Sequence, residues 1–217
     1  MIERPILFNA QMVRALLDGR KTQTRRIWKM PRWAEWDIDG GEERGYIIPT
    51  NPKHRGWYSV AEIVSPYGRE RDRLWVREAW ADLTELHGQH WERLNNETKR
   101  YERGVNPFVW YRADGEQPDI GSDAIKPEPW RPSIHMPRWA SRILLEVTEV
   151  RVERLQEISI QDAMAEGVAE TAPRLKDLEP CMEWCYAYED LWNVINGPGS
   201  WDANPWVWVI AFKRVMP

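Results

Sequence analysis

The chain has 217 residues, of which 42% are hydrophobic and 29% charged, and its formal net charge is −4. This balance supports a packed core and excludes a wholly disordered chain, and the small negative charge argues against a nucleic-acid coat protein. No run of 18 apolar residues occurs, so the sequence offers no transmembrane helix. The length favours one domain, 1–217, over two.

Cysteine usage and charge distribution indicate the compartment and the kind of surface. Two cysteines are too few for a disulfide framework, and the first residues lack the apolar stretch of a secretory signal. We therefore expect a reduced, cytoplasmic protein that does not bind a membrane. Residues 1–32 hold eight basic and two acidic residues, whereas residues 151–190 hold ten acidic and four basic ones. Such asymmetry is typical of a surface that faces a polyanion, or of two segments that pair in the fold.

The first predicted element is a helix over 10–18. Asn9 is a good N-cap, four apolar residues between 12 and 17 fall at helical spacing, and Gly19 supplies the left-handed residue that ends the helix. The chain then leaves the helix through the basic segment 19–26, which reads Gly-Arg-Lys-Thr-Gln-Thr-Arg-Arg. Its alternating threonine and arginine residues favour an extended conformation, so the basic segment begins at a helix-to-strand junction.

The middle of the chain is less regular. Residues 31–70 are rich in Pro, Gly, Trp and charged residues, and we expect loops around one or two short strands. Residues 73–77 give a clearer strand prediction than any part of 31–70. Residues 83–130 are polar and broken by Gly and Pro, which predicts a long insertion into a compact core.

Two strands are predicted in the second half of the chain. One runs from 143 to 152, and a change of inward-facing parity near Thr148-Glu149 indicates a bulge. The other closes the chain at 206–215. Strands outnumber helices and show no βαβ alternation, so we expect an α+β, mainly β fold: a small barrel with flanking helices.

Two helices are predicted beside those strands. Ser159 opens a short helix that ends at Glu166, where Gly167 supplies the left-handed residue. A longer helix is expected over about 180–196, because apolar residues recur there with a period of 3.6 and Gly197 follows them.

The common signatures of catalysis are missing. The sequence has no P-loop, no dinucleotide-binding glycine motif and no nucleophile elbow. His87 and His90 lie in the polar insertion, Cys181 and Cys185 lie on one predicted helix, and no second ligand cluster has the spacing of a zinc site. We therefore predict no metal site and no cofactor.

The basic segment 19–26 is the strongest local feature. In the simplest interpretation it is a solvated turn whose cations complement the dipole of the preceding helix. A catalytic interpretation starts from Lys21, because neighbouring arginines disfavour its charge and burial would lower its pKa further, so that it could act as a base. A threonine hydroxyl needs such a base to become a nucleophile, and Thr24 is three residues away.

This segment also resembles the opening motif of ASCH domains, which are relatives of the PUA fold, and especially of the members that phages and prophages encode. The resemblance spans nearly the whole chain apart from the insertion, because it continues at 72–78, at 136–143, at 158–167 and in the final strand. It implies a PUA-like (ASCH) barrel core with a cleft.

The resemblance also implies a set of catalytic residues. In the small bacterial ASCH proteins that hydrolyse N4-acetylcytidine, a lysine, a threonine and a glutamate form this set, and the matching positions here are Lys21, Thr24 and Glu166. Lys21 would activate Thr24, Thr24 would attack the acyl carbonyl, and Glu166 would orient Lys21 or move a proton. A helix C-terminus disfavours the Glu166 carboxylate unless Lys21 pairs with it. The alternative role of Glu166 is a plain ion pair to the basic segment.

Three functions stay open at this point. The preferred one is an amidohydrolase that removes an acyl group from a modified cytidine-type nucleobase or nucleoside. The residues predicted to bind its substrate are Arg25, Arg26, Trp75, Arg77 and Glu78, with Trp28 as a second candidate for stacking. The second is a non-catalytic module that binds RNA, or less readily DNA, through these arginines and some of the 15 tryptophans. The third is a phage accessory protein that binds a host protein through the insertion. The oligomeric state is not predicted.

Overall fold

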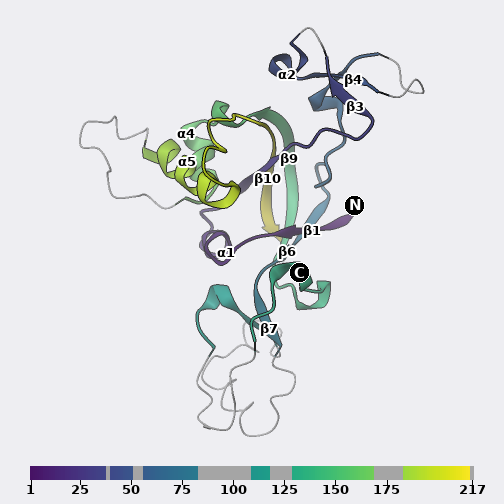
Figure 1. The fold of residues 1–217 in the computed structure, drawn as a ribbon. Coiled ribbons are helices and arrows are strands. Elements are labelled where there is room, and N and C mark those ends of the chain that lie inside the picture. Colours follow the sequence, from purple (N-terminus) through teal and green to yellow (C-terminus); the bar gives the residue numbers. More distant parts are fainter. Residues whose placement is uncertain (38–39, 51–55, 83–108, 118–128, 169–182, 216–217) are drawn as a thin grey trace, which may run out of the picture. The chain divides into compact units, whose positions relative to one another are not determined.

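The computed structural model describes residues 1–37, 40–50, 56–82, 109–117, 129–168 and 183–215 (Figure 1). The chain divides into two compact units. Unit 1 comprises residues 1–19, 73–146 and 214–217, and unit 2 comprises residues 20–72 and 147–213. Both units are therefore assembled from segments that lie far apart in the sequence.

Unit 1 contains a parallel and an antiparallel strand pairing. Strand β1 (Glu3–Leu7) lies parallel to β6 (Arg73–Arg77), and β6 is antiparallel to the start of β9 (Leu144–Arg154). Alternate residues of β6 are buried, which is the pattern of a strand with one face on a core. The predicted strand at 73–77 is confirmed.

Helix α1 (Ala10–Leu17) belongs to the same unit and has the predicted ends. The Asn9 side chain accepts a hydrogen bond of 2.8 Å from the Met12 N–H, so it caps the helix. Gly19 has a φ of 76°, the left-handed conformation that glycine adopts most readily after a helix. The buried face of α1 holds Val13, Ala15 and Leu16.

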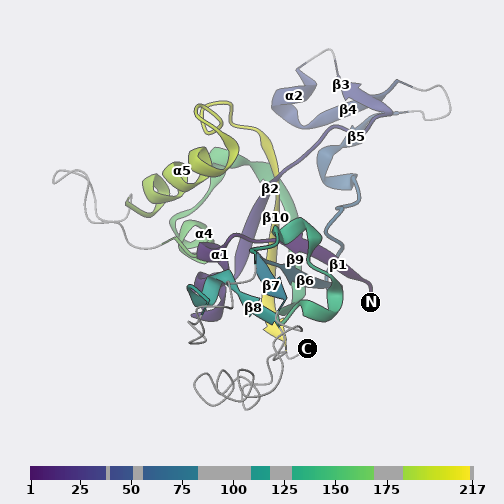
Figure 2. The same ribbon diagram turned by 60° about the horizontal axis from the view of Figure 1, so that its bottom comes forward.

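A two-stranded sheet completes unit 1. Strands β7 (Trp80–Asp82) and β8 (Val109–Tyr111) lie side by side in Figure 2, with Trp80 opposite Tyr111. The core around them comprises Trp80, Val109, Tyr111, Met136 and Ala140. Three short 3₁₀ helices follow at Arg112–Asp114, Ser133–His135 and Arg138–Ala140. Residues 109–117 of the predicted insertion therefore belong to unit 1, and most of the remainder of 83–130 lies outside the described residues.

The sheet of unit 2 joins β2 (Gln23–Ile27), β10 (Trp206–Val215) and the rest of β9. Strands β2 and β10 are antiparallel, with Thr24 opposite Ile210. The predicted strand at 206–215 is confirmed, and so is a long strand in the region 143–152. Thr148 and Glu149 are both exposed, which breaks the alternation of β9 where the sequence predicted a change of parity.

Helices α4 (Ile160–Ala165) and α5 (Glu183–Asn196) contact each other beside this sheet (Figure 1). They share a core with the 3₁₀ helix Leu155–Glu157, and its buried residues are Leu155, Ile158, Ala163, Val168, Ala187, Tyr188, Trp192, Val207 and Val209. Ser159 caps α4 through a 3.1 Å bond from the Asp162 N–H, and Gly167 has a φ of 79°. Both helices were predicted, although residues 180–182 of the second lie outside the described residues.

The region 31–70 contains more regular structure than predicted. Strands β3 (Ala34–Trp36), β4 (Tyr46–Pro49) and β5 (Tyr58–Ser59) form an antiparallel sheet, with a short helix α2 (Gly41–Arg44) between β3 and β4. The 3₁₀ helix Val60–Glu62 follows. The sequence predicted only one or two strands here, because elements of two to four residues are too short to show a periodicity.

The α+β class is confirmed, but the predicted barrel is wrong: the strands of the described residues form open sheets. Within these residues β1 pairs only with β6 and β2 pairs only with β10, so no pairing closes a barrel. The long strands do not show this in the sequence, because the alternation of buried residues is the same in an open sheet and in a barrel. In the described part of the chain, no helix has the length and apolar composition to cross a membrane.

Candidate active site

Lys21 and Glu166 form a buried ion pair in unit 2. Lys21 lies just before β2, and its main chain bridges to that of Glu166 at the end of α4. Its Nζ donates to Glu166 Oε2 at 2.9 Å, to the main-chain oxygen of Glu166 at 2.9 Å and to that of Gln23 at 2.8 Å. These acceptors match the three N–H donors of an ammonium group. The structure therefore brings two of the three predicted catalytic residues into contact.

Local structure explains why Glu166 lies there. Helix α4 begins at its Ser159 cap and ends with Glu166 as the C-terminal cap, where main-chain carbonyls have no partner within the helix. The Lys21 ammonium donates to the main-chain oxygen of Glu166, which places a cation at the negative end of the helix dipole. Arg20 donates to the next main-chain oxygen, that of Gly167, at 3.0 Å. The basic segment thus also closes the end of α4.

Arg25 is the second buried cation, and three carboxylates surround it. Its side chain is fully buried and contacts Glu166 at 3.3 Å, Asp162 at 3.1 Å and Glu153. Because β2 places Arg25 next to α4 and β9, the guanidinium links both elements to the same strand. A planar group with five donors suits this arrangement, whereas a lysine ammonium would not span it.

Arg151 extends the network along β9. It contacts the same Glu153 and Asp162 carboxylates at 3.0 Å each. We call the six residues the charged cluster: Lys21, Arg25, Arg151, Glu153, Asp162 and Glu166. With three cations and three anions, the cluster neutralises itself inside unit 2.

Burial and charge act in opposite directions on Lys21. Burial lowers the pKa of Lys21, the Glu166 carboxylate opposes this, and the Arg26 and Arg25 charges lower the pKa further. The net effect is a pKa below 10.5. Removal of Lys21 from water is therefore a larger cause than the neighbouring arginines that the sequence indicates.

Burial and neighbouring charges also shift the pKa values of Asp162 and Tyr188. Burial raises the pKa of Asp162, but the Arg25 and Arg151 charges outweigh it and bring the value below 3.8. Burial also raises the pKa of Tyr188 well above 10.0, and the Glu166 charge adds to the shift. Tyr188 lies on α5, with the Arg25 guanidinium 5.9 Å from its ring centroid.

Thr24, the third predicted catalytic residue, is buried in β2. Side chains alternate along a strand, so Thr24 and Arg26 share one face and Arg25 lies on the other. Lys21 and Arg25 both contact Glu166, and the Arg26 charge contributes to the lowered pKa of Lys21. Trp28, further along the same face, is buried and packs against Trp36 with ring centroids 5.5 Å apart.

The other predicted substrate-binding residues belong to unit 1. The Arg77 guanidinium lies 5.2 Å from the Trp75 ring centroid, and its Nε donates to the Met136 carbonyl at 2.9 Å. Glu78 is buried and binds Arg142 through both carboxylate oxygens, at 3.0 and 3.1 Å. These contacts of Arg77 and Glu78 lie within unit 1 and involve no residue of the charged cluster.

Sequence reasoning missed four residues around the pair: Arg151, Glu153, Asp162 and Tyr188. A signal existed for the first two, because Arg151 and Glu153 are two residues apart and therefore share a face of β9. Asp162 lies within the short helix predicted between Ser159 and Glu166, and the sequence assigns it no role at the site. Tyr188 lies within the longer predicted helix, and the structure buries it in the core that α4 and α5 share.

The described residues contain no group of three or more His, Cys, Asp and Glu side chains that could hold a metal ion. His87, His90 and Cys181 lie outside them, and Cys185 is half-buried on α5. Comparisons with protein-family models, with curated proteins and with solved structures found no match to this chain.

Proposed function

We propose that this protein is an amidohydrolase with a PUA-like (ASCH) core, which removes an acyl group from a modified cytidine-type nucleobase or nucleoside. Lys21, Thr24 and Glu166 are its reacting residues. The observation that carries the proposal is the buried contact of 2.9 Å between Lys21 Nζ and Glu166 Oε2, together with the lowered pKa of Lys21. A lowered pKa makes it easier for Lys21 to become the neutral amine that a general base requires.

The reaction proceeds through an acyl-enzyme. Neutral Lys21 takes the hydroxyl proton of Thr24 while Thr24 Oγ1 attacks the acyl carbonyl. The tetrahedral intermediate then collapses and the carbon–nitrogen bond breaks. The proton passes from Lys21 to the amine of the nucleobase, which is the leaving group. Water then hydrolyses the threonine ester and releases the carboxylic acid. Glu166 holds Lys21 Nζ in place and exchanges a proton with it.

The contacts of Lys21 suit this proton exchange. Transfer of one proton from Nζ to Glu166 Oε2 leaves an amine with two N–H donors and a neutral carboxyl group. The amine keeps two acceptors, the main-chain oxygens of Gln23 and Glu166. Both protonation states are therefore hydrogen-bonded at the same position, which lowers the cost of changing between them.

The burial of Arg25 argues against the nucleic-acid-binding module, and equally against the predicted contact of Arg25 with the substrate of a hydrolase. In that module Arg25 would contact phosphate. Its side chain is instead fully buried against three carboxylates, so phosphate binding would require breaking these contacts.

The direct test is release of cytidine from N4-acetylcytidine by the purified protein. We expect turnover by the wild type, and loss of at least about 100-fold in kcat for both Lys21→Met and Thr24→Val, because a base and a nucleophile are removed. Thr22→Val is the matched control: Thr22 is exposed and lies between them in the sequence, so its loss should leave turnover within about twofold, as for a surface substitution.

The opposite result would reject the proposal. If the folded wild type releases no cytidine, the proposed activity is rejected. If Thr24→Val retains full turnover, Thr24 is not the nucleophile of this reaction. Thermal unfolding of each variant establishes that it is folded. Electrospray mass spectrometry of the quenched reaction adds a second criterion, because only a threonine nucleophile leaves an acetyl group on the peptide that contains residue 24.

A further inference from the structure

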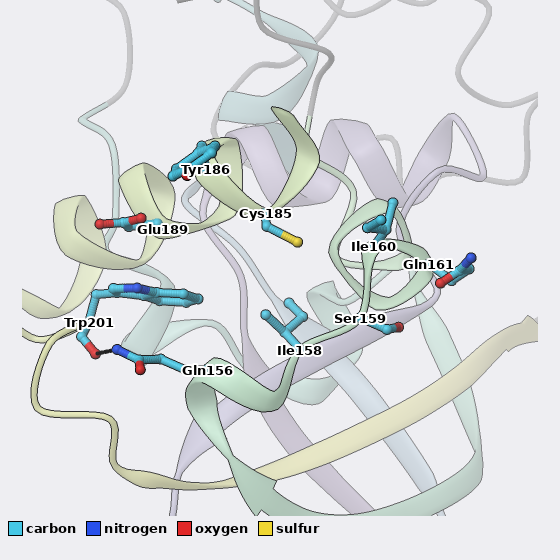
Figure 3. A pocket seen from close by; sticks show the side chains of 9 residues that line it. All are labelled: Gln156, Ile158, Ser159, Ile160, Gln161, Cys185, Tyr186, Glu189 and Trp201. Carbon is cyan, nitrogen blue, oxygen red and sulfur yellow. Dashed lines mark hydrogen bonds between the residues drawn. The ribbon is translucent and has the colours of Figure 1, made fainter. Parts of the chain in front are cut away.

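Unit 2 has a pocket of about 530 Å³ that the proposed reaction does not use (Figure 3). Helix α5 forms one wall, and the segment from Gln156 to Gln161, which leads into α4, forms the other. The volume falls in the range of sites that enclose small organic molecules. Figure 3 shows the indole of Trp201 and the side chains of Ile158 and Cys185 directed into the same space.

Trp201 is held in place before any ligand arrives. Its main-chain N–H donates to Asn193 Oδ1 at 3.1 Å, and its main-chain oxygen accepts from the Gln156 side-chain amide at 3.0 Å. Its ring meets Tyr188 edge to face, with centroids 6.2 Å apart. These two bonds fix the main chain of Trp201 and the edge-to-face contact packs its ring, so the indole is suited to be a flat wall of the site.

The wall formed by α5 carries a carboxylate. Glu189 and Tyr186 line the pocket from α5, one turn apart, together with Cys185. Burial, Asp190 and Asp202 all disfavour a further negative charge at Glu189 and raise its pKa. A positive charge placed beside Glu189 would relieve this repulsion. Aromatic rings on the same pocket also attract cations through their faces.

We propose that this pocket binds a small planar organic cation, with its ring against Trp201 and its charge beside Glu189. The apolar side chains of Ile158 and Ile160 cover the ring. Gln156 and Gln161 add polar side chains to the lining, and the Gln156 amide donates to the main-chain oxygen of Trp201. The proposal does not depend on the hydrolase, because none of the lining residues belongs to the charged cluster.

The test uses three probes of nearly equal shape and different charge: benzamidine, benzamide and benzoate. Titration calorimetry and saturation-transfer NMR with the full chain measure their binding. We expect benzamidine to bind about tenfold more tightly than neutral benzamide, because the charge adds a carboxylate contact and a cation–π contact. Benzoate should not bind. Equal affinities for the three probes, or preference for benzoate, would overturn the proposal.

Variants locate the probe. Glu189→Gln removes the charge at the pocket, and Trp201→Leu removes the flat wall. Each should weaken benzamidine by about fivefold or more. Glu183→Gln removes a carboxylate from the same helix outside the pocket lining, and it should leave the affinity unchanged. If Glu183→Gln weakens benzamidine as much as Glu189→Gln does, the binding is non-specific attraction to an acidic helix and the proposal fails.

Discussion

Lys21 binds Glu166 twice, through the carboxylate and through the main-chain oxygen, with Nζ 2.9 Å from each. The main-chain oxygen belongs to the cap residue of α4, so a single ammonium group neutralises the glutamate and completes the helix end. Any change of charge at Lys21 therefore alters both the reacting pair and the end of α4.

The stability of the protein should depend on pH through Lys21. Its pKa is lower in the folded chain than the value of 10.5 in the unfolded chain, so the unfolded state binds more protons between these two values. Stability therefore rises with pH across that interval. Urea unfolding from pH 7 to pH 10.5 should show this rise in the wild type and not in Lys21→Met. Parallel curves for the two proteins would show that the pKa of Lys21 is not lowered.

Tyr188 should act in the opposite direction at higher pH. In the unfolded chain its hydroxyl ionises at 10.0, whereas burial and Glu166 keep it protonated in the folded chain. Above pH 10 the unfolded state therefore loses a proton that the folded state retains, and stability falls as the pH rises. Tyr188→Phe removes the hydroxyl and should remove this part of the alkaline loss. The difference between the two unfolding curves above pH 10 measures it.

Arg25 should be the most costly residue of the charged cluster to replace. Arg25→Gln leaves Glu153, Asp162 and Glu166 close together without their shared cation, and loss of a partner from a buried ion pair costs about 3–5 kcal/mol. Arg25→Lys restores the charge but not the planar fork, so it should recover only part of the free energy of unfolding. Full recovery in urea unfolding would mean that charge alone matters at this position.

Substitutions at the two glycines beside α2 should distinguish the stability cost of backbone strain from the cost of overpacking. Gly40 and Gly45 flank α2 with φ values of 82° and 73°. A Cβ at Gly45 would lie 2.8 Å from the Trp206 ring and 3.1 Å from Val60, whereas a Cβ at Gly40 would meet no described atom within 4 Å. We expect Gly40→Ala to cost about 1–2 kcal/mol from the left-handed backbone alone. Gly45→Ala should cost about 1–3 kcal/mol more, from overpacking.

Equal losses of stability in the two glycine variants would contradict this interpretation. Trp206 would then have room to move away from the new methyl group. A change in the fluorescence of Gly45→Ala compared with Trp206→Phe would report such a movement directly.

Local signals predicted the elements around the site well. Asn9 and Gly19 fix the two ends of α1, and Ser159 and Gly167 do the same for α4, because a cap and a left-handed residue act within a few positions of the helix they bound. The resemblance to ASCH domains, together with helix-dipole reasoning, led us to expect that Lys21 could pair with Glu166, and the structure shows this contact.

The partners of Arg25 could not be predicted in the same way. They lie 128 to 141 residues away in the sequence and reach it only when α4 and β9 assemble on β2. A basic segment looks the same in sequence whether its arginines face solvent or buried carboxylates. For this reason the sequence predicts that Arg25 binds substrate. The sequence likewise does not indicate that the sheets of the described residues are open.

The pairing of β2 with β10 also sets the order of events during synthesis. Gln23–Ile27 leave the ribosome early, but Val207–Ala211, their partners in the sheet, are made only after roughly 180 further residues, a separation that slows folding. We therefore expect the charged cluster, in which Arg25 joins β2 to α4 and β9, to assemble late in folding, because among the described strands β2 pairs only with β10.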